Sequence, residues 1–155
     1  MAQHKPPFTL ETAHRKVKAA QALWNTRDPS KVAQAYTPTS IWRNRSTFLR
    51  GHAAIEDFLT KKWEKEKEYR LRKELFAQQD NRIGVQFWYE YRDAQDSMIW
   101  KRCYGIEHWT FAADGKMEKR MMSGNDVVIG EEERWFKDGA DVDSVALGEA
   151  DFQGQ

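Results

Sequence analysis

The side chains that could carry acid–base chemistry in this sequence are two glutamates, a histidine and an aspartate. They are Glu90, Glu107, His108 and Asp126. A lyase, isomerase or hydrolase that works without a cofactor needs one such group near the reacting proton and a donor for the developing oxyanion. The candidate donors are Trp42, Tyr89, Tyr104 and the arginines. An arginine beside Glu107 would keep that carboxylate ionised, which favours a structural role or a ligand clamp over a general acid.

A second polar group lies in the stretch SIWRNR, residues 40–45, where two arginines and an asparagine follow a tryptophan. As a ligand site, this stretch would orient an acidic or carbonyl-bearing molecule. As a polar seam of the fold, its arginines would pair with buried glutamates. Strand alternation sends Trp42 and Asn44 to one side and Arg43 and Arg45 to the other. We therefore favour the seam, with at most one arginine left for a ligand.

The aromatic content suits a binding protein, the first of three functional hypotheses. Aromatic residues form 13% of the chain, and an aromatic cavity holds an apolar body while a few polar groups orient it. The predicted ligand contacts are Trp42, Asn44, Arg45, Trp63, Tyr89, Tyr104, Trp109, Arg120 and Asn125. The second hypothesis is the cofactor-free enzyme described above. The third is a dimeric structural or interaction module without a ligand.

Composition argues against several other classes of protein. The 155 residues suit one domain, and the net charge of +1 gives no electrostatic case for nucleic acid or an anionic membrane. The four histidines share no metal-ligand spacing, and one cysteine cannot build a disulfide framework. The N-terminus has no apolar signal core, and no run approaches the roughly 18 apolar residues of a spanning helix. We expect a cytoplasmic protein without a metal or a cofactor.

Hydrophobic spacing changes from a helical to a strand period near the middle of the chain. It predicts helices over residues 9–26, from 29 to about 36, and from 51 to about 67. The charged end of the third helix, KKWEKEKE, is expected to be solvated. Strands are predicted over residues 40–45, 69–79, 82–93, 98–113 and 116–129. Three helices followed by mostly antiparallel strands indicate an α+β domain.

The last predicted hairpin fixes which residues lie opposite one another. A two-residue turn at Asp114-Gly115 places Ala113 opposite Lys116 and Trp109 opposite Arg120. The same register sets Glu107 opposite Met122 and Tyr104 opposite Asn125. One face then carries the residues Cys103, Glu107, Trp109, Phe111, Arg120 and Met122. We expect this face to line the cavity. We expect His108, on the other face, to be a hydrogen-bonded core histidine.

Six pieces of the sequence together resemble the nuclear transport factor 2-like (SnoaL-like) superfamily, in a subfamily of unknown function. They are SIWRNR (40–45), FLRGHAAIEDFLTKKWEKE (48–66), YRLRKELFA (69–77), FWYEY (87–91), YGIEHWTF (104–111) and GKMEKRMMSGNDVVI (115–129). Ile106 departs from the pattern, since a polar residue is expected there, and so does Gly124, which replaces a bulkier apolar residue.

The resemblance implies a cone-shaped, curved, mostly antiparallel sheet wrapped around three N-terminal helices, with a pocket at the open end. It implies a homodimer joined through the outer sheet face and no metal or organic cofactor. The superfamily contains isomerases, cyclases, dehydratases and epoxide hydrolases as well as binding and scaffold proteins, so the fold does not fix the function. We assign residues 1–136 to this domain. Residues 137–155 form an acidic tail that we expect to be mobile or ordered by a partner.

Overall fold

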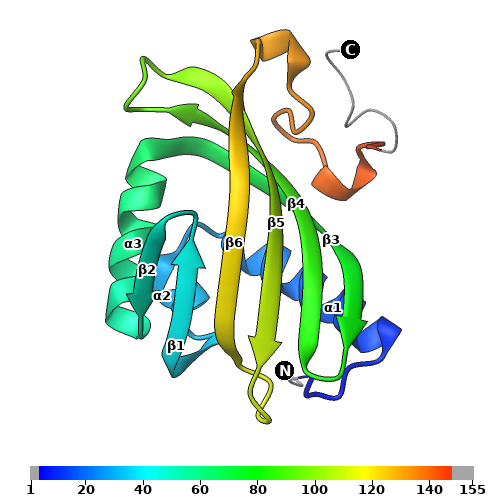
Figure 1. Ribbon diagram of the computed structural model, residues 1–155. Coiled ribbons are helices and arrows are strands. Elements are labelled where there is room, and N and C mark those ends of the chain that lie inside the picture. The colour runs from blue at the N-terminus through cyan, green and yellow to red at the C-terminus, as the bar shows by residue number, and fades with distance from the viewer. Residues whose placement is uncertain (1–3, 148–155) are drawn as a thin grey trace.

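The computed structural model describes residues 4–147, in which a six-stranded sheet curves around three helices (Figure 1). The helices are α1 (Leu10–Trp24), α2 (Pro29–Ala33) and α3 (His52–Lys65). The strands are β1 (Tyr36–Asn44), β2 (Thr47–Arg50), β3 (Glu66–Gln79), β4 (Arg82–Asp93), β5 (Ile99–Phe111) and β6 (Met117–Val128). The strand order is β2-β1-β6-β5-β4-β3, and only the β1–β6 pair within this sheet is parallel. The predicted α+β cone is confirmed.

Local sequence signals set where the first two helices begin. The Thr9 hydroxyl accepts a hydrogen bond from the backbone N–H of Thr12 at 3.1 Å, and the Thr12 hydroxyl accepts from Thr9 N–H at 2.9 Å. Two of the donors that a helix leaves without partners are thereby satisfied. The Asp28 carboxylate caps α2 by accepting from the backbone N–H groups of Ser30 and Lys31, and Pro29 occupies the first turn, where no N–H partner is required.

The first strand is longer than the sequence predicted. The helix predicted from residue 29 was expected to run to about residue 36, yet β1 already begins at Tyr36 and includes Pro38. Proline is tolerated here because the pairing of β1 with β6 is irregular between Tyr36 and Ile41, so the missing N–H interrupts no regular ladder. The hairpin partner β2 was missed, because four residues give too short a pattern to recognise.

The predicted register of the last hairpin is confirmed, although its turn differs. Trp109 lies opposite Arg120, and Glu107 lies opposite Met122. The turn, however, has three residues: Ala112 N–H donates to the Lys116 carbonyl at 2.8 Å, and Gly115 adopts a left-handed φ of 90°. A three-residue hairpin loop with glycine in this conformation adds a bulge. The bulge absorbs the extra residue and leaves the rest of the register unchanged.

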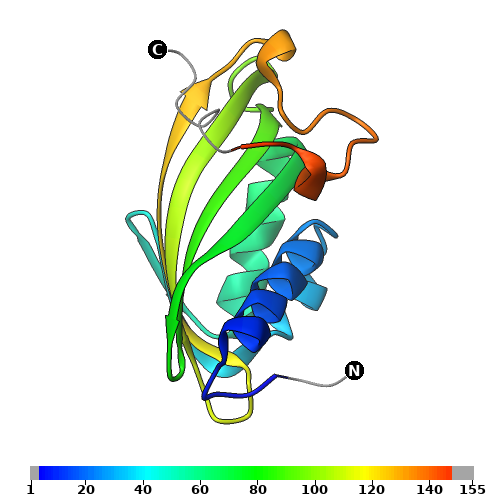
Figure 2. The same cartoon turned by 90° about the vertical axis from the view of Figure 1, so that its right-hand side faces the viewer.

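Two apolar clusters hold the molecule together. The larger lies between the helices and the inner face of the sheet, and the predicted face with Cys103, Glu107 and Trp109 points into it. The smaller forms on the outer face, where Trp88 packs with Phe136, Val142 and Leu147. We call residues 130–147 the C-terminal strap, since they run from the end of β6 past the β3 edge (Figure 2).

The strap bears on the expectation of a mobile tail. Arg70 on β3 donates to the Lys137 carbonyl at 2.6 Å and also to the Ala140 carbonyl. Arg72 donates to the Val142 carbonyl at 3.2 Å and also to that of Val145. These contacts join residues 137–145 to the chain's own sheet, whereas residues 148–155 lie outside the described residues. The mobility of the tail stays a prediction. The domain boundary after residue 136 stays a prediction.

Candidate functional site

A pocket of about 570 Å³ lies at the open end of the cone, between the β1–β2 turn and α3. We call it the mouth pocket. Its apolar wall comes from Leu49, Ala54 and Phe58, and Tyr89 reaches it from β4. Its cationic lining residues are Arg45, Lys61, Lys62 and Lys65. An apolar wall with a few polar groups is typical of small-molecule sites.

Arg45 enters the mouth pocket because the chain turns immediately after β1. It adopts a left-handed φ of 57° in the β1–β2 turn, so strand alternation no longer decides where its side chain points. The guanidinium lies 2.5 Å from the Asp126 carboxylate and 3.3 Å from the Cys103 sulfur, and it also donates to the Gly124 carbonyl. Arg45 thus links the pocket to β6.

The Asp126 carboxylate is the acceptor at the centre of this group. Tyr91 donates its hydroxyl hydrogen bond to the second carboxylate oxygen. Burial acts to raise the pKa of Asp126, but the Tyr91 hydrogen bond and the Arg45 charge hold that pKa below its ordinary value. Burial and the negative charge of Asp126 raise the pKa of Cys103 to about 12. Cys103 is therefore an inert thiol and Asp126 a permanent anion.

Glu66 is a pocket residue that the sequence argument missed. It was placed in a solvated helix end, yet its residue exposure is 9% and that of the Lys62 side chain is also 9%. The two groups pair at 2.8 Å, and the Lys62 ammonium lies 4.2 Å from the ring centroid of Tyr89. Burial raises the pKa of Glu66 despite the Lys62 charge. This combination is typical of functional carboxylates, and helical spacing from Leu59 and Trp63 could have revealed it.

Deeper in the cone, three charges form a closed network. Glu107 accepts from Arg120 Nε at 2.6 Å and from the Lys73 ammonium, and Arg120 Nη1 donates to Asn44 Oδ1 at 3.1 Å. The Arg120 guanidinium lies 4.4 Å from the Trp42 ring centroid. All of these side chains except Asn44 are buried. They pack against one another. The polar-seam interpretation expected the arginines of residues 40–45 to pair with buried glutamates, but Glu107 pairs with Arg120 and Lys73, and Arg45 pairs with Asp126.

The pKa shifts in this network follow from burial and charge. Burial opposes ionisation of Glu107, but Lys73 and Arg120 hold its pKa below the ordinary value of 4.5. Burial lowers the pKa of Lys73 to about 8, although Glu107 acts in the opposite direction. Glu107 is therefore a fixed anion. This supports the structural role that we preferred for it over a general acid.

The predicted site residues divide between the two faces of the sheet. The inner set comprises Trp42, Asn44, Arg45, Trp63, Tyr89, Glu107, Trp109, Arg120 and Asp126. Of these, the mouth pocket is lined by Asn44, Arg45 and Tyr89. The outer set comprises Glu90, Tyr104, His108 and Asn125. The sheet separates these four from the inner set, except that Arg45 also borders a second hollow that Tyr104 and Asn125 line. The expectation of a core histidine is wrong: His108 is exposed.

Glu90 has a partner that the sequence did not predict. Its carboxylate accepts from Arg102 Nε at 2.8 Å and from the backbone N–H groups of Trp135 and Phe136, both at 2.9 Å. Glu90 is 1% exposed. An ionised carboxylate that receives several N–H donors is strongly held. Glu90 therefore fastens the C-terminal strap to the outer face and takes no part in the mouth pocket.

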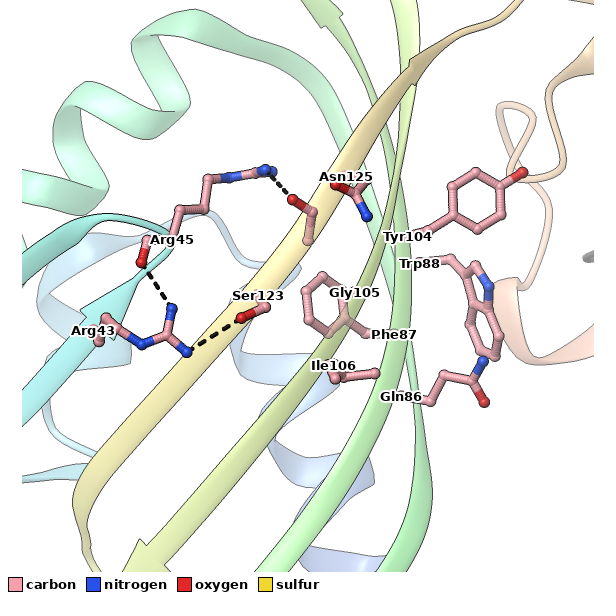
Figure 3. A pocket seen from close by; sticks show the side chains of 11 residues that line it. Arg43, Arg45, Gln86, Phe87, Trp88, Tyr104, Gly105, Ile106, Ser123 and Asn125 are labelled. Carbon is pink, nitrogen blue, oxygen red and sulfur yellow. Dashed lines mark hydrogen bonds between the residues drawn. The ribbon is translucent and has the colours of Figure 1, made fainter.

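A second hollow of about 540 Å³, the outer groove, lies on the outer face between the strap and the β1–β2 hairpin (Figure 3). Tyr104, Trp88 and Ile106 line it from β5 and β4. On the opposite side, Arg43 donates to the Arg45 carbonyl at 2.7 Å and to the Ser123 hydroxyl at 3.2 Å. Arg43 is thus bound by neutral acceptors and faces away from the mouth pocket.

The comparison with known proteins places the chain in a family. A family model described as "Protein of unknown function (DUF1348)" matches residues 6–137. The chain belongs to this family. The DUF1348 chain has the fold of the nuclear transport factor 2-like superfamily, as the resemblance implied. Among curated proteins, none matches it by sequence.

Solved structures share the DUF1348 fold at low sequence identity. SalBIII, an epoxide hydrolase/cyclase-like enzyme of pyran ring formation in salinomycin, aligns with a TM-score of 0.66 at 14% identity, over 74% of this chain and 92% of its own. A protein assigned as a SnoaL-like polyketide cyclase from Shewanella denitrificans aligns with a TM-score of 0.63 at 13% identity, over 74% of this chain and 90% of its own. A protein with a ketosteroid isomerase-like fold from Catenulispora acidiphila aligns with a TM-score of 0.62 at 7% identity, over 70% of this chain and 83% of its own. At these identities the likeness concerns the fold alone.

Residues 4–147 also bear on metal binding and on membrane insertion. Those residues contain no cluster of three or more histidine, cysteine, aspartate or glutamate side chains that could hold a metal ion. None of the helices in that range has both the length and the hydropathy needed to cross a membrane. The cytoplasmic location stays a prediction.

Proposed function

We propose that this protein binds a small molecule with an apolar body and a carbonyl or acidic group, and that the mouth pocket is its site. The observation that carries the proposal is the combination of volume and lining. About 570 Å³ is available at the open end of the cone, between the apolar side chains of α3 and four cationic residues. Volumes of about 300–1,000 Å³ are usual for small-molecule sites.

The charges of the mouth pocket suit a ligand oxygen. Two of the lining cations pair with lining carboxylates, as Lys61 does with Asp57 at 3.0 Å and Lys62 with Glu66 at 2.8 Å. Arg45 and Lys65 pair with carboxylates that do not line the pocket, Asp126 at 2.5 Å and Asp93 at 3.9 Å. The lining itself thus carries more cations than anions, which favours a carbonyl or a carboxylate over an ammonium ligand.

Thermal shift with a panel of small carbonyl compounds and carboxylates tests this proposal. A ligand that binds the folded state raises the melting temperature, by mass action. Each hit is repeated on Thr47→Trp, which fills the pocket from an exposed position in its lining, and on Thr39→Trp, an exposed control on β1. We expect the shift to disappear in Thr47→Trp and to remain in Thr39→Trp. Equal shifts in both variants would place the ligand elsewhere and refute the proposal.

A second candidate function, cofactor-free catalysis, is favoured by Glu66. This carboxylate lines the mouth pocket, and burial raises its pKa, as a general acid or base requires. If the protein is an enzyme, a ligand found by thermal shift is converted, and Glu66→Gln abolishes conversion while the ligand still binds. A ligand recovered unchanged from the wild-type protein supports the binding function instead.

A further inference from the structure

A separate pocket of about 330 Å³ lies between α1, α2 and the β5–β6 connection. We call it the α1–α2 pocket. It includes Phe111 at the end of β5, whereas the mouth pocket includes Gln95, which precedes β5. The two sites are therefore separated by the length of that strand. Figure 2 shows the N-terminal part of α1, in blue, at the same end of the molecule as the β5–β6 connection.

The wall of the α1–α2 pocket is largely apolar. Its apolar side chains are Ala20, Leu23, Ala35, Trp109, Phe111 and Met117. They come from α1, from the link between α2 and β1, and from the paired ends of β5 and β6, which the main core holds in place. Rigid elements thus preform this hollow. An apolar ligand body that enters it removes its own surface and that of the wall from water.

Three lysines surround this apolar wall, one from each of its three elements. They are Lys16 on α1, Lys31 on α2 and Lys116 in the β5–β6 connection. Within residues 4–147, none of the three has a carboxylate at ion-pair distance, in contrast to the paired cations of the mouth pocket. Asp114 acts on Lys16 only at longer range. Three cations without an ion-pair partner leave a positive potential at the pocket.

The ammonium group of Lys16 is partly removed from water, which disfavours its charged form. Its ammonium lies 5.3 Å from the ring centroid of Phe111, so part of its hydration is replaced by an aromatic face. Burial lowers the pKa of Lys16 to about 8. An anion bound beside Lys16 would supply a counter-charge at ion-pair distance, whereas Asp114 acts on it only from farther away.

We propose that the α1–α2 pocket is a binding site for an amphipathic carboxylate, whose apolar body lies against Trp109, Phe111 and Leu23 and whose head group lies among the three lysines. Charge selects the class of ligand, because an ammonium would be repelled by the lysines and a neutral alcohol would gain no ion pair. The size of the hollow selects a short chain or a single ring, since about 330 Å³ is near the lower limit for ligand sites. This site does not depend on the function proposed for the mouth pocket.

Octanoate is the probe for this site, measured by calorimetry or by NMR titration of the full chain. The triple variant Lys16→Gln, Lys31→Gln, Lys116→Gln removes the head-group partners. We expect it to bind octanoate about tenfold more weakly, because it removes three exposed ion pairs that each contribute little alone. Octylamine, with a chain of the same length and the opposite charge, is expected not to bind wild type.

Matched controls separate this site from net charge and from the mouth pocket. The triple variant Lys5→Gln, Lys119→Gln, Lys137→Gln changes the net charge equally and touches neither pocket, so its affinity should stay within about twofold of wild type. Ala19→Phe fills the α1–α2 pocket from an exposed helix position and should abolish binding. Thr47→Trp, which fills the mouth pocket, should leave octanoate binding unchanged.

Three results would overturn the proposal. They are no octanoate binding to wild type at millimolar concentration, equal weakening in both lysine triples, and loss of binding in Thr47→Trp but not in Ala19→Phe. The last would assign octanoate to the mouth pocket, so failure here is distinguishable from failure of the proposed function.

If binding occurs, it should weaken between pH 7 and 9 as Lys16 loses its proton, with Asp114, Lys31 and Lys116 as the neighbouring charged groups. Lys16→Gln should reduce that pH dependence.

Discussion

Glu107 is the side chain on which the interior charge balance depends. It lies between two buried cations, Lys73 and Arg120, so the three groups together carry one net positive charge in the core. Removing one partner of a buried ion pair leaves an uncompensated charge, which is strongly destabilising. Removal of Glu107, Lys73 or Arg120 should therefore lower the free energy of unfolding by different amounts, although all three side chains are buried.

We predict that Glu107→Gln lowers the free energy of unfolding by about 3–5 kcal/mol, because it leaves two buried cations facing each other. Lys73→Met should cost clearly less, since it leaves the neutral pair of Glu107 with Arg120 and fills the same volume. Urea unfolding followed by tryptophan fluorescence measures both. Equal losses in the two variants would contradict this account of the network.

Acid titration gives an independent control on the same residue. The pKa of Glu107 is lower in the folded state than its ordinary value of 4.5. Its contribution to stability is therefore complete above that value and is lost as the pH falls through the folded pKa. The difference in unfolding free energy between wild type and Glu107→Gln should narrow below about pH 4. A difference that stays constant into strong acid would exclude the ion-pair explanation.

At the scale of the elements, local sequence signals predicted the strands better than they predicted the candidate site. The predicted boundaries of β4 agree with the observed Arg82–Asp93, and the hairpin register of β5 and β6 was correct, because alternation and turn residues are local properties. The short strand β2 was missed, and so was the turn that brings Arg45 to the mouth pocket, although Arg45 was among the predicted ligand contacts. Both depend on a left-handed turn at a residue other than glycine, which carries no sequence signal.

The candidate site was predicted only in part for a related reason. Alternation assigned Glu107 and Trp109 to the inner face correctly, but it could not tell a filled interior from an open pocket. Whether Arg120 contacts a ligand or Trp42 depends on side-chain volumes that come together from distant strands. Glu66 was missed because the charged run around it is indistinguishable by composition from a solvated helix end.

The C-terminal strap gives the element-scale prediction. Glu90→Gln removes the negative charge that receives the N–H groups of Trp135 and Phe136 and the Arg102 guanidinium. We expect the backbone amides of residues 135–147 to lose protection from hydrogen exchange, while those at the centres of β4 and β5 remain protected. Native-state exchange read by mass spectrometry or NMR measures this.

Glu118→Gln is the matched control for the strap, because Glu118 is exposed on β6 and does not touch it. Its exchange pattern should equal that of wild type. If Glu90→Gln also leaves the strap protected, then the contacts of Arg70 and Arg72 hold the segment without Glu90, and the assignment of Glu90 as its fastening is wrong. Uniform loss of protection across the sheet would instead make Glu90 part of the global core.

At the scale of the whole molecule, the outer sheet face is the candidate surface for association with another chain. Ile106 is 57% exposed on β5, Phe48 is 74% exposed on β2, and Phe76 is 80% exposed on β3. Phe48 and Phe76 lie on the two opposite edge strands of the sheet, and Ile106 lies on a central strand. The strap covers Trp88 on the same face, so a partner that leaves it in place would meet the uncovered part of the sheet near β5, β6 and β1.

We propose a homodimer through this uncovered face. Light scattering coupled to size exclusion at micromolar concentration should give twice the chain mass of 18.3 kDa. Ile106→Lys introduces a charge at the centre of the face and should shift the mass to that of one chain, because like charges meet across a two-fold axis. Leu10→Lys, at a 69% exposed position on α1, should remain a dimer. A wild-type mass of one chain would refute the dimer, and with it the hypothesis of a dimeric interaction module.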